Sequence, residues 1–520
     1  MHLPETNRRR LLTLAGGMAI FAGLTGTRVW AQPAFDSDPF ALGVASGDPW
    51  PDGFVIWTRL APKPLEEHGG MPMVDVAVKW EVAEDEAFAK IVRNGEAVAR
   101  PELGHSVHVE IAGLQSRRPY FYRFTVGDAR SRTGMAKTAP VAGSAPERVR
   151  FAVAGCQNWE NGYYTAYRHL SREADLDAVF HYGDYIYESK ANTNAAKPPV
   201  RPHAGGEIYS LDDYRRRYAQ YRTDTDLQAA HAAVAFITSF DDHEIDNNWA
   251  SAYDQDNTPP EIFALRKASA MQAWYENSPV RLAQFPTPGG VNAYRRLDYG
   301  SLVRMHVLDT RSYRDKQPCR ATNLPGCRPT EDANTTIMGK VQEAWLDDGL
   351  ANGATWNLLA QQVLVMPLDS RNPGAAQPDY SDDNWNGYAP ARQRLVRSIM
   401  ERRLTNVVIA TGDAHETFVG NVPVRDEAPD GPVAAAEFLA ASISSGGDGL
   451  TGHAKQDAWQ VHNPNLKLLN SQRGYQVHDI TAKQWLTDVR VMDKVTVPNG
   501  AISTLTRFVV TPDKPGLTKA

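Results

Sequence analysis

Cysteine is scarce in this chain, which has only three in 520 residues. Cys319 and Cys327 flank the short loop RATNLPG, so a disulfide between them is the simplest interpretation. Cys156 is then left without a partner, at the end of the apolar run FAVAG. So few cysteines exclude a small disulfide scaffold. If the chain is exported, an odd cysteine is expected to be reactive, intermolecular or bound to a metal.

An excess of basic charge is also absent. Lysine and arginine number 55 against 61 aspartates and glutamates, which gives a formal net charge of −6. This balance does not favour nucleic acid as a partner, and the sequence contains no long acidic tail, internal repeat or low-complexity tract. With 42% hydrophobic residues, a chain of this length is expected to bury a large core and to form two or three domains.

The N-terminus lacks an apolar run long enough for a comfortable membrane span. The stretch LLTLAGGMAIFAGLTG is short and rich in glycine, whereas a span needs about 20 apolar residues. Three arginines precede it, and Val29-Trp30-Ala31 forms a small-x-small cleavage pattern after it. We therefore predict a signal peptide over residues 1–31 and no transmembrane segment in the mature chain.

The segment Asn7-Arg8-Arg9-Arg10-Leu11-Leu12 has the form of a twin-arginine export signal. An ordinary Sec signal, whose first residues are also basic, is the alternative. The twin-arginine route implies the twin-arginine translocon as a partner during export, and the periplasm or the medium as the destination. That route carries proteins already folded, often with a metal inserted.

Two folding patterns follow the predicted signal. Residues 36–146 alternate apolar and polar residues in short runs such as FVIWTRL and PYFYRF, which predicts a fibronectin-III-like β-sandwich. Tyr120 or Tyr122 is expected to close a tyrosine corner. From Val149 buried strands alternate with helical segments, so residues 149–510 are predicted to form an α/β domain that ends in a β-hairpin.

Five apolar strands of this second region end in polar residues. In α/β sheets, ligands bind outside the carboxyl ends of the strands, so these residues are expected to lie together. Gathering so many acids needs positive charge between them, and metal ions are the natural counter-charge. The residues are Cys156 in AGC, Asp184 and Tyr187 in HYGDYIYE, Asp241, Asp242, His243 and Asn248 in SFDDHEIDNN, Asp309 and Arg311 in LDTRSYR, and Asp413 and His415 in ATGDAHE.

The order and form of these motifs resemble the calcineurin-like metallophosphoesterases. Cys156 stands where that superfamily has Asp-x-His, Asp242 where it has Asn, and Asp413 where it has the first His of GHxH. These substitutions, with LDTRSYR, the export signal and an N-terminal domain opening with FALGVASGDPWPDGFVIWTRL, resemble the PhoD-type alkaline phosphatases. The resemblance implies a four-layer α/β/β/α sandwich preceded by the fibronectin-III-like domain.

The resemblance also implies a set of metal ligands. Iron(III) would be held by Cys156, Asp184, Tyr187 and His415, which agrees with the preference of trivalent iron for thiolate and phenolate. Calcium would be held by Asp184 as a bridge, Asp241 or Asp242, Asn248 and Asp383, with Asp413 at a further ligand position. The family form DxWDGY is altered in DNWNGY, where Asn386 stands at the second acid. Spacing alone also permits zinc.

The expected activity is hydrolysis of phosphoesters through a metal-bound hydroxide. His243 would protonate the leaving group or hold the phosphate, and Arg311 would clamp a phosphate oxygen, unless each has only a structural role. A phospholipase D-like phosphodiesterase acting on phospholipids is one alternative. A cysteine hydrolase with Cys156 as nucleophile is another, and a calcium-stabilised binding protein with a degenerate site is the third.

Overall fold

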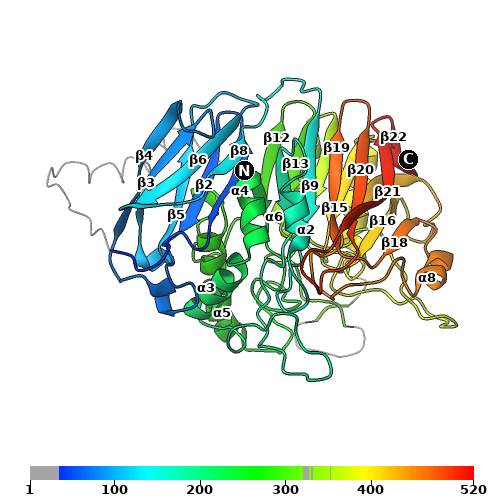
Figure 1. Cartoon of the computed structure of the whole chain (residues 1–520). Helices are drawn as coiled ribbons and strands as arrows, with labels where there is room; N and C mark the ends of the chain where they lie inside the picture. Colours follow the sequence, from blue (N-terminus) through cyan, green and yellow to red (C-terminus); the bar gives the residue numbers. More distant parts are fainter. Residues whose placement is uncertain (1–33, 320–326, 330–331, 352) are drawn as a thin grey trace, which may run out of the picture.

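Two β-sheets packed face to face form the centre of the molecule (Figure 1). This computed structural model describes residues 34–319, 327–329, 332–351 and 353–520, so the predicted signal peptide lies outside the described residues. The ten-stranded sheet has the order β22 (Lys514–Lys519), β21 (Ile502–Thr511), β20 (Trp485–Met492), β19 (Gly474–Ile480), β9 (Val149–Ala154), β10 (Ala178–His181), β11 (Phe236–Thr238), β1 (Val44–Trp50), β2 (Gly53–Arg59) and β5 (Ser106–Ile111). The seven-stranded sheet has the order β12 (Arg295–Tyr299), β13 (Val303–Val307), β14 (Trp356–Ala360), β15 (Val407–Thr411), β17 (Val433–Leu439), β16 (Thr417–Pro423) and β18 (Leu466–Asn470).

Apolar side chains of the two sheets meet in a shared core. Phe151 and Phe180 from the ten-stranded sheet belong to one buried cluster with Met305 and Leu358 from the seven-stranded sheet. The strands β9, β10 and β11 are parallel neighbours, as are β13, β14 and β15. These strands are buried on both faces, which explains why the sequence shows them as nearly continuous apolar runs.

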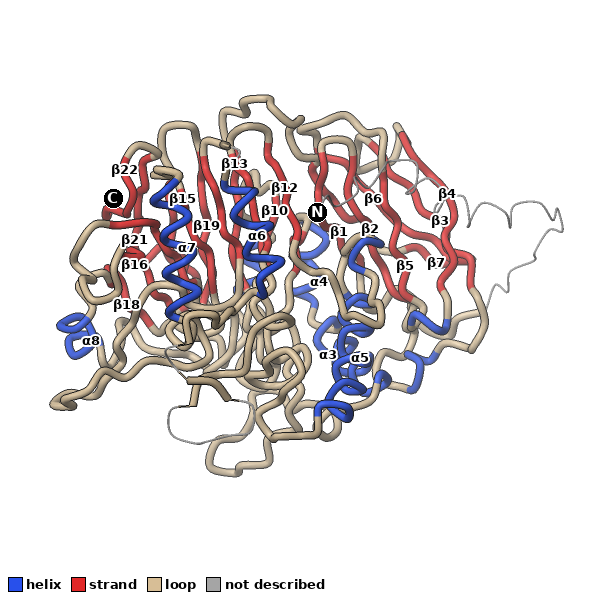
Figure 2. Tube along the Cα trace, turned by 180° about the vertical axis from the view of Figure 1, so that it is seen from behind, coloured by secondary structure: helices blue, strands red, loops and turns tan. Residues whose placement is uncertain are grey.

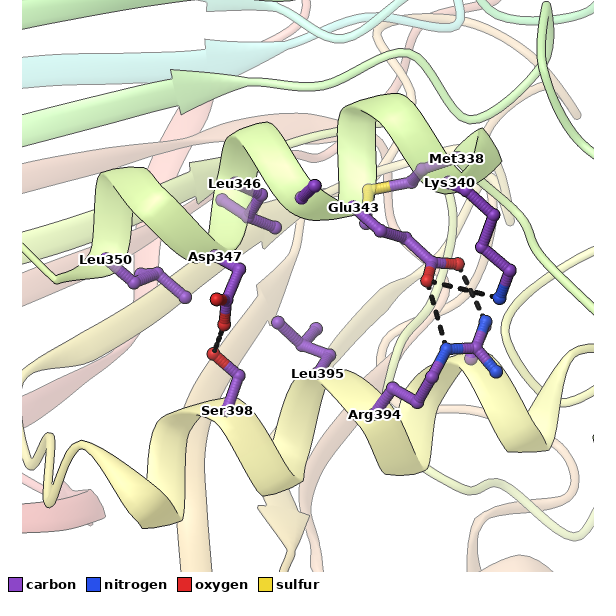
Figure 3. Close-up of a pocket in the computed structure, with 11 residues that line it drawn as sticks. Met338, Lys340, Glu343, Leu346, Asp347, Leu350, Arg394, Leu395 and Ser398 are labelled. Atoms are coloured by element: carbon purple, nitrogen blue, oxygen red, sulfur yellow. Dashed lines mark hydrogen bonds and ion pairs between the residues drawn. The ribbon is translucent and has the colours of Figure 1, made fainter. Parts of the chain in front are cut away.

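Helices cover both outer faces and complete the four layers. The outer face of the ten-stranded sheet is covered by α2 (Thr165–Leu170), α3 (Leu211–Arg222), α4 (Thr225–Ala233) and α5 (Pro260–Asn277). On the other side, α6 (Gly339–Leu350) and α7 (Ala389–Glu401) lie over the outer face of the seven-stranded sheet (Figure 2). A groove between these two helices has an apolar lining that includes Leu346 and Leu395, and ion pairs such as Glu343–Arg394 bridge it (Figure 3).

The N-terminal strands do not form a sandwich closed on itself. A five-stranded sheet of β3 (Val76–Ala83), β4 (Ile91–Ala99), β6 (Pro119–Val126), β7 (Ala129–Arg130) and β8 (Gly134–Lys137) packs on β1, β2 and β5. Those three strands belong to the ten-stranded sheet, because β1 pairs in parallel with β11 through Gly47 and Phe236. The predicted tyrosine corner is present at Tyr120, whose hydroxyl accepts the backbone N–H of Gln115 at 2.9 Å.

The predicted C-terminal hairpin is also present, as the antiparallel pair β19–β20. The disulfide between Cys319 and Cys327 is formed, and Cys156 is buried and free. Within the described part of the chain, no helix is long and apolar enough to cross a membrane.

Candidate metal centre

The structure brings the polar strand ends together at one end of the two sheets. Three groups of ligand atoms lie there, each with its members within 4.8 Å of one another. They are Cys156 with Asp184 and His415, Asp184 with Asp242 and His243, and Asp241 with Asp242 and Asp413. Asp184 belongs to two groups and Asp242 to two, so the three groups form one continuous cluster.

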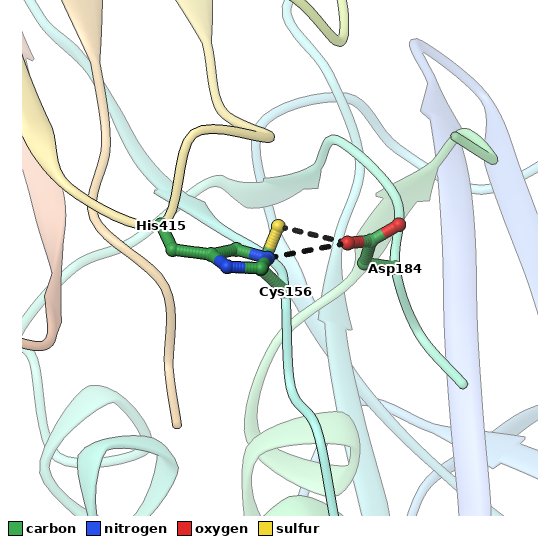
Figure 4. Close-up of side chains that lie close together, drawn as sticks. All are labelled: Cys156, Asp184 and His415. Atoms are coloured by element: carbon green, nitrogen blue, oxygen red, sulfur yellow. Dashed lines mark hydrogen bonds and ion pairs between the residues drawn. The ribbon is translucent and has the colours of Figure 1, made fainter. Parts of the chain in front are cut away.

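The first group contains three of the predicted site residues, which Figure 4 shows, and Tyr187 lies beside them. Cys156 Sγ lies 3.2 Å from Asp184 Oδ2, and His415 Nε2 lies 3.7 Å from the same oxygen. The Tyr187 hydroxyl is 2.7 Å from Asp184 Oδ2 and 2.9 Å from His415 Nε2. A thiol, a phenol, an imidazole and a carboxylate therefore face one another over a few ångströms.

Asn248 and Asp383 lie beside Asp242 of the second group. The side-chain amide of Asn248 lies 3.1 Å from Asp383 Oδ2 and 3.2 Å from Asp242 Oδ2. With its NH2 group toward these two oxygens, Asn248 donates a hydrogen bond to each carboxylate. Of the two neighbouring acids, Asp242 is the one that faces both Asn248 and Asp184.

Arg311 is fully buried among the acids. Its guanidinium forms ion pairs with Asp241, with Asp383 at 2.6 Å, with Asp413 at 3.2 Å and with Asp242 at 3.6 Å. The Asp309 carboxylate accepts a hydrogen bond from the backbone N–H of Arg311. Arg311 thus supplies part of the positive charge that balances the acids. From the sequence, only metal ions were expected to supply this charge. Even so, Asp241 Oδ2 is buried and has no hydrogen-bond partner among the described residues.

His243 lies at the edge of the cluster. Its backbone N–H donates to Asp242 Oδ1 at 3.1 Å, and its ring Nδ1 is 2.7 Å from Glu188 Oε2. Burial opposes the charged imidazolium, but the carboxylates of Glu188, Asp184 and Asp242 outweigh burial and raise the pKa of His243 well above its ordinary value. Its side chain is 18% exposed, that of Asp413 26% and that of His415 34%, so the cluster is open to solvent on this side.

The backbone at the site is strained. Non-glycine residues rarely adopt a positive φ, and each such residue costs of the order of 1–3 kcal/mol. Gly183, directly before Asp184, has φ +133° and lies so close to Asp241 that an added Cβ would be 2.4 Å from its backbone nitrogen. Strain of this kind gathers at functional sites. The site residues with positive φ are Cys156 (51°), Asp184 (53°), Asn248 (54°), Asp413 (70°) and His415 (62°).

The electrostatics of the cluster favour bound cations. Burial, with the carboxylates of Asp184 and Asp413, raises the pKa of the Cys156 thiol well above its ordinary value. Burial and Asp184 likewise raise the pKa of the Tyr187 phenol. Burial raises the pKa of Asp241 to about 8 although Arg311 opposes this shift. A cation would favour the deprotonated forms of these groups, which are the forms that bind metals.

Several residues that support the site were not predicted from the sequence. Glu244 is buried and accepts the backbone N–H groups of Asp184 at 3.0 Å, Tyr185 at 2.7 Å and Asp241 at 2.8 Å. Glu244 therefore links the turn after β10 to the turn after β11. Its position in the motif DDHE was the sequence signal that could have indicated this role. Ser445 lies 2.6 Å from the Tyr187 hydroxyl but comes from a loop 258 residues away, and no local pattern marked it.

Comparisons with known proteins identify the family of the chain. The profile of the PhoD-like phosphatase family matches residues 151–489, and that of the N-terminal domain of PhoD-like phosphatases matches residues 26–140. Alkaline phosphatase D of Bacillus subtilis (strain 168) is 44% identical over 522 residues, which cover 99% of this chain and 89% of that protein. The chain belongs to the PhoD-like phosphatase family. As a PhoD-like phosphatase, it is a phosphoric ester hydrolase.

Solved structures agree with this assignment. The chain superposes on a structure of PhoD with a TM-score of 0.90 and 45% sequence identity, covering 94% of this chain and 93% of the other. The purple acid phosphatase PPD1 from yellow lupin (Lupinus luteus) seeds shares the fold, with a TM-score of 0.54 at 12% identity over 90% of this chain and 73% of that one. The predicted fold class of this PhoD-like phosphatase, with its N-terminal domain, is confirmed.

Proposed function

We propose that this PhoD-like phosphatase is an exported alkaline phosphatase/phosphodiesterase whose cluster holds iron(III) and calcium. The iron ligands would be Cys156, Asp184, Tyr187 and His415. The observation that carries this proposal is the approach of a thiol and a phenol to the same carboxylate oxygen, at 3.2 and 2.7 Å. Thiolate and phenolate donate charge strongly and suit a trivalent iron.

The calcium ligands would be Asp184, Asp242, Asn248 and Asp383, because these four side chains meet in the neighbouring part of the cluster. Carboxylate and amide oxygens are the donors that calcium prefers. The third group consists of Asp242 with Asp241 and Asp413, and it adds two further carboxylates to the cluster. Bound cations would activate a water molecule and neutralise charge on the phosphoryl oxygens.

The protein's own residues would orient the substrate and move protons. His243 stands on the open side of the cluster and is the proposed donor to the leaving oxygen. Arg311 was predicted to clamp a phosphate oxygen. Its burial and its four carboxylate partners instead support a positioning role, in which it holds the acids of three loops in one arrangement.

Export through the twin-arginine translocon to the periplasm or medium is proposed from Arg8, Arg9 and Arg10 and the apolar stretch that follows them. These residues lie in the part of the chain that the structure does not describe. The disulfide between Cys319 and Cys327 is in keeping with an oxidising destination. Whether monoesters or diesters are preferred depends on the pocket walls rather than on the ligands.

The test replaces Cys156 by serine. Cys156→Ser should lose iron and hydrolysis of both p-nitrophenyl phosphate and bis-p-nitrophenyl phosphate, and should leave the circular dichroism spectrum unchanged. The double variant Cys319→Ser/Cys327→Ser removes the other two sulfurs and should keep its iron. Hydrolysis at the full rate after chelation, abolished by a thiol alkylator, would instead support a cysteine hydrolase. The buried thiol, which faces Asp184, does not favour that alternative.

A further inference from the structure

Gln362 is a fully buried amide that follows strand β14 by two residues. Its Oε1 accepts the backbone N–H of Thr310 at 3.0 Å and the Thr310 hydroxyl at 2.6 Å. Its Nε2 donates to the Leu308 carbonyl at 2.9 Å and to the Ser239 hydroxyl at 2.7 Å. All four hydrogen-bonding positions of this amide are therefore used, although β14 contributes none of the candidate metal ligands.

The contact between Gln362 and Ser239 joins the two central sheets. Ser239 directly follows β11 of the ten-stranded sheet, whereas Gln362 follows β14 of the seven-stranded sheet. The shared core of these sheets is a cluster of apolar side chains such as Phe180 and Leu358. Apolar contacts are non-directional, so a fully satisfied buried hydrogen-bond network adds a single preferred alignment of one sheet on the other.

Gln362 contacts three loops that each carry a charged residue of the cluster. Besides the two bonds described above, its backbone carbonyl accepts the N–H of Gly412 at 2.8 Å. In each loop, the residue that Gln362 contacts lies one or two positions before a member of the cluster. The pairs are Ser239 with Asp241, Thr310 with Arg311, and Gly412 with Asp413.

The cluster itself depends on how the two sheets are aligned. Asp241 and Asp242 follow a strand of the ten-stranded sheet and Asp413 follows a strand of the seven-stranded sheet, yet their ligand atoms lie within 4.8 Å of one another. The Arg311 guanidinium also pairs with acids from both sheets. We propose that Gln362 is a positioning residue for phosphoester hydrolysis, which aligns the two sheets at this end and so sets the spacing of Asp241 and Asp413. This inference rests on the proposed function of the cluster.

The decisive variant is Gln362→Met. Methionine has a similar length and fills the space, but it supplies neither the donor that the Leu308 carbonyl needs nor the acceptor that the Thr310 N–H needs. A misplacement of about 1 Å in a site costs up to about 10²-fold, so we expect kcat on p-nitrophenyl phosphate to fall about 10- to 100-fold in the folded variant. KM should change less than about threefold, because no contact with the substrate is removed.

A double-mutant cycle with Ser239→Ala isolates the bond between the sheets. Ser239→Ala removes only this bond and should lower kcat about 3- to 10-fold. In that background, Gln362→Met should cost less than it does alone, because the alignment has already been lost. A role in stability alone would lower the melting temperature without coupling the two positions in kcat.

Amide hydrogen exchange provides a readout other than activity. The Thr310 N–H donates to the side chain of Gln362, whereas the Gly412 N–H donates to its backbone carbonyl. In Gln362→Met, the peptide that contains Thr310 should therefore exchange faster, while the peptide that contains Gly412 should keep most of its protection.

The matched control is Asn357→Leu. Asn357 is a fully buried amide near the opposite end of β14, and its Nδ2 lies 3.5 Å from Asn406 Oδ1. This substitution also replaces a buried amide by an apolar side chain of similar size, but far from the cluster. We expect a lower melting temperature and an unchanged kcat at temperatures where the variant is folded.

An unchanged kcat in Gln362→Met would overturn the inference, and so would losses that simply multiply in the double variant. If Gln362→Met does not fold, Ser239→Ala decides, and an unchanged kcat in that variant overturns the inference. Full activity in Asp184→Asn would contradict the proposed function of the cluster, and the inference would fall with it. An inactive Asp184→Asn beside a fully active Gln362→Met would contradict the inference alone.

Discussion

At the scale of single residues, the cluster is a group of acidic side chains with one buried arginine among them. Arg311 pairs with Asp241, Asp242, Asp383 and Asp413, and burial still raises the pKa of Asp241 to about 8. One guanidinium is thus insufficient for the acids around it. Arg311 holds the acids together, and bound cations would complete the neutralisation.

Replacing Arg311 by methionine should therefore destabilise the protein strongly. Removing one partner of a buried ion pair costs about 3–5 kcal/mol because the remaining charge is left uncompensated. We expect Arg311→Met to lower the free energy of unfolding by about this amount when measured by urea denaturation in the presence of a chelator. Added calcium should recover part of the loss.

The control for this measurement is Arg425→Met. Arg425 pairs with Glu427 on the surface, where both side chains are well exposed, so its removal should change the unfolding free energy little. A loss in Arg311→Met no larger than in Arg425→Met would contradict the counter-charge role.

The sequence located most of the cluster because its residues directly follow buried strands. Cys156, Asp184, Asp242, Asp413 and His415 all do so, and the structure brings them together. It did not locate Ser445, and it did not pair Glu188 with His243. Both contacts depend on how separate loops meet, and this is not encoded in local periodicity.

At the scale of elements, strands and helices were predicted where the sequence has a clear apolar pattern and were missed where it has none. Strands β9, β10 and β15 were predicted from their apolar runs. Helix α3, with the sequence LDDYRRRYAQYR, was not predicted, because its buried stripe consists of Tyr214, Tyr218 and Tyr221 set among charged residues. Its buried positions include Arg215, Arg217 and Arg222, and a capping box between Ser210 and Asp213 begins it.

The hairpin β19–β20 carries a buried histidine that makes stability depend on pH. Burial lowers the pKa of His478 to about 3, and its Nδ1 accepts the indole N–H of Trp485 at 3.0 Å. The unfolded chain takes up a proton near pH 6.5, whereas the folded chain does so only near pH 3. The stabilisation is therefore present above pH 6.5 and is lost as the pH falls toward 3.

His478→Gln removes this titration. Each pH unit in this window is worth about 1.4 kcal/mol per proton. Between pH 7.5 and 5.0 the wild type should therefore lose about 2 kcal/mol of unfolding free energy relative to the variant, as measured by urea denaturation. The exposed substitution His462→Gln is the control and should show little difference. A wild type and His478→Gln with parallel pH profiles would contradict the assignment.

At the scale of the whole molecule, the N-terminal and C-terminal parts share one sheet. Besides the β1–β11 pairing, the Trp57 indole donates to the Glu276 carbonyl at 2.9 Å, and Arg59 donates to the Arg215 carbonyl at 3.1 Å. The sequence predicted a separate fibronectin-III-like sandwich over residues 36–146 because the strands there alternate apolar and polar residues. Pairing of β1 with a strand almost 200 residues away leaves no local signal.

This shared sheet predicts cooperative unfolding. We expect calorimetry to show one transition, because loss of β1, β2 and β5 exposes the β11 edge and the buried partners of Trp57 and Arg59. A chain that begins at Val149 should accordingly fail to fold. Two separate calorimetric transitions, or a folded and active chain from Val149 onward, would contradict this expectation.

We propose that iron and calcium together occupy the cluster and that both are required for phosphoester hydrolysis. Elemental analysis of the purified protein, combined with its visible absorption spectrum and its rate on p-nitrophenyl phosphate, tests this most directly. The predicted result is iron and calcium in every active preparation, with a phenolate-to-iron absorption band that disappears in Tyr187→Phe. A metal-free preparation that hydrolyses the substrate at the full rate would contradict it.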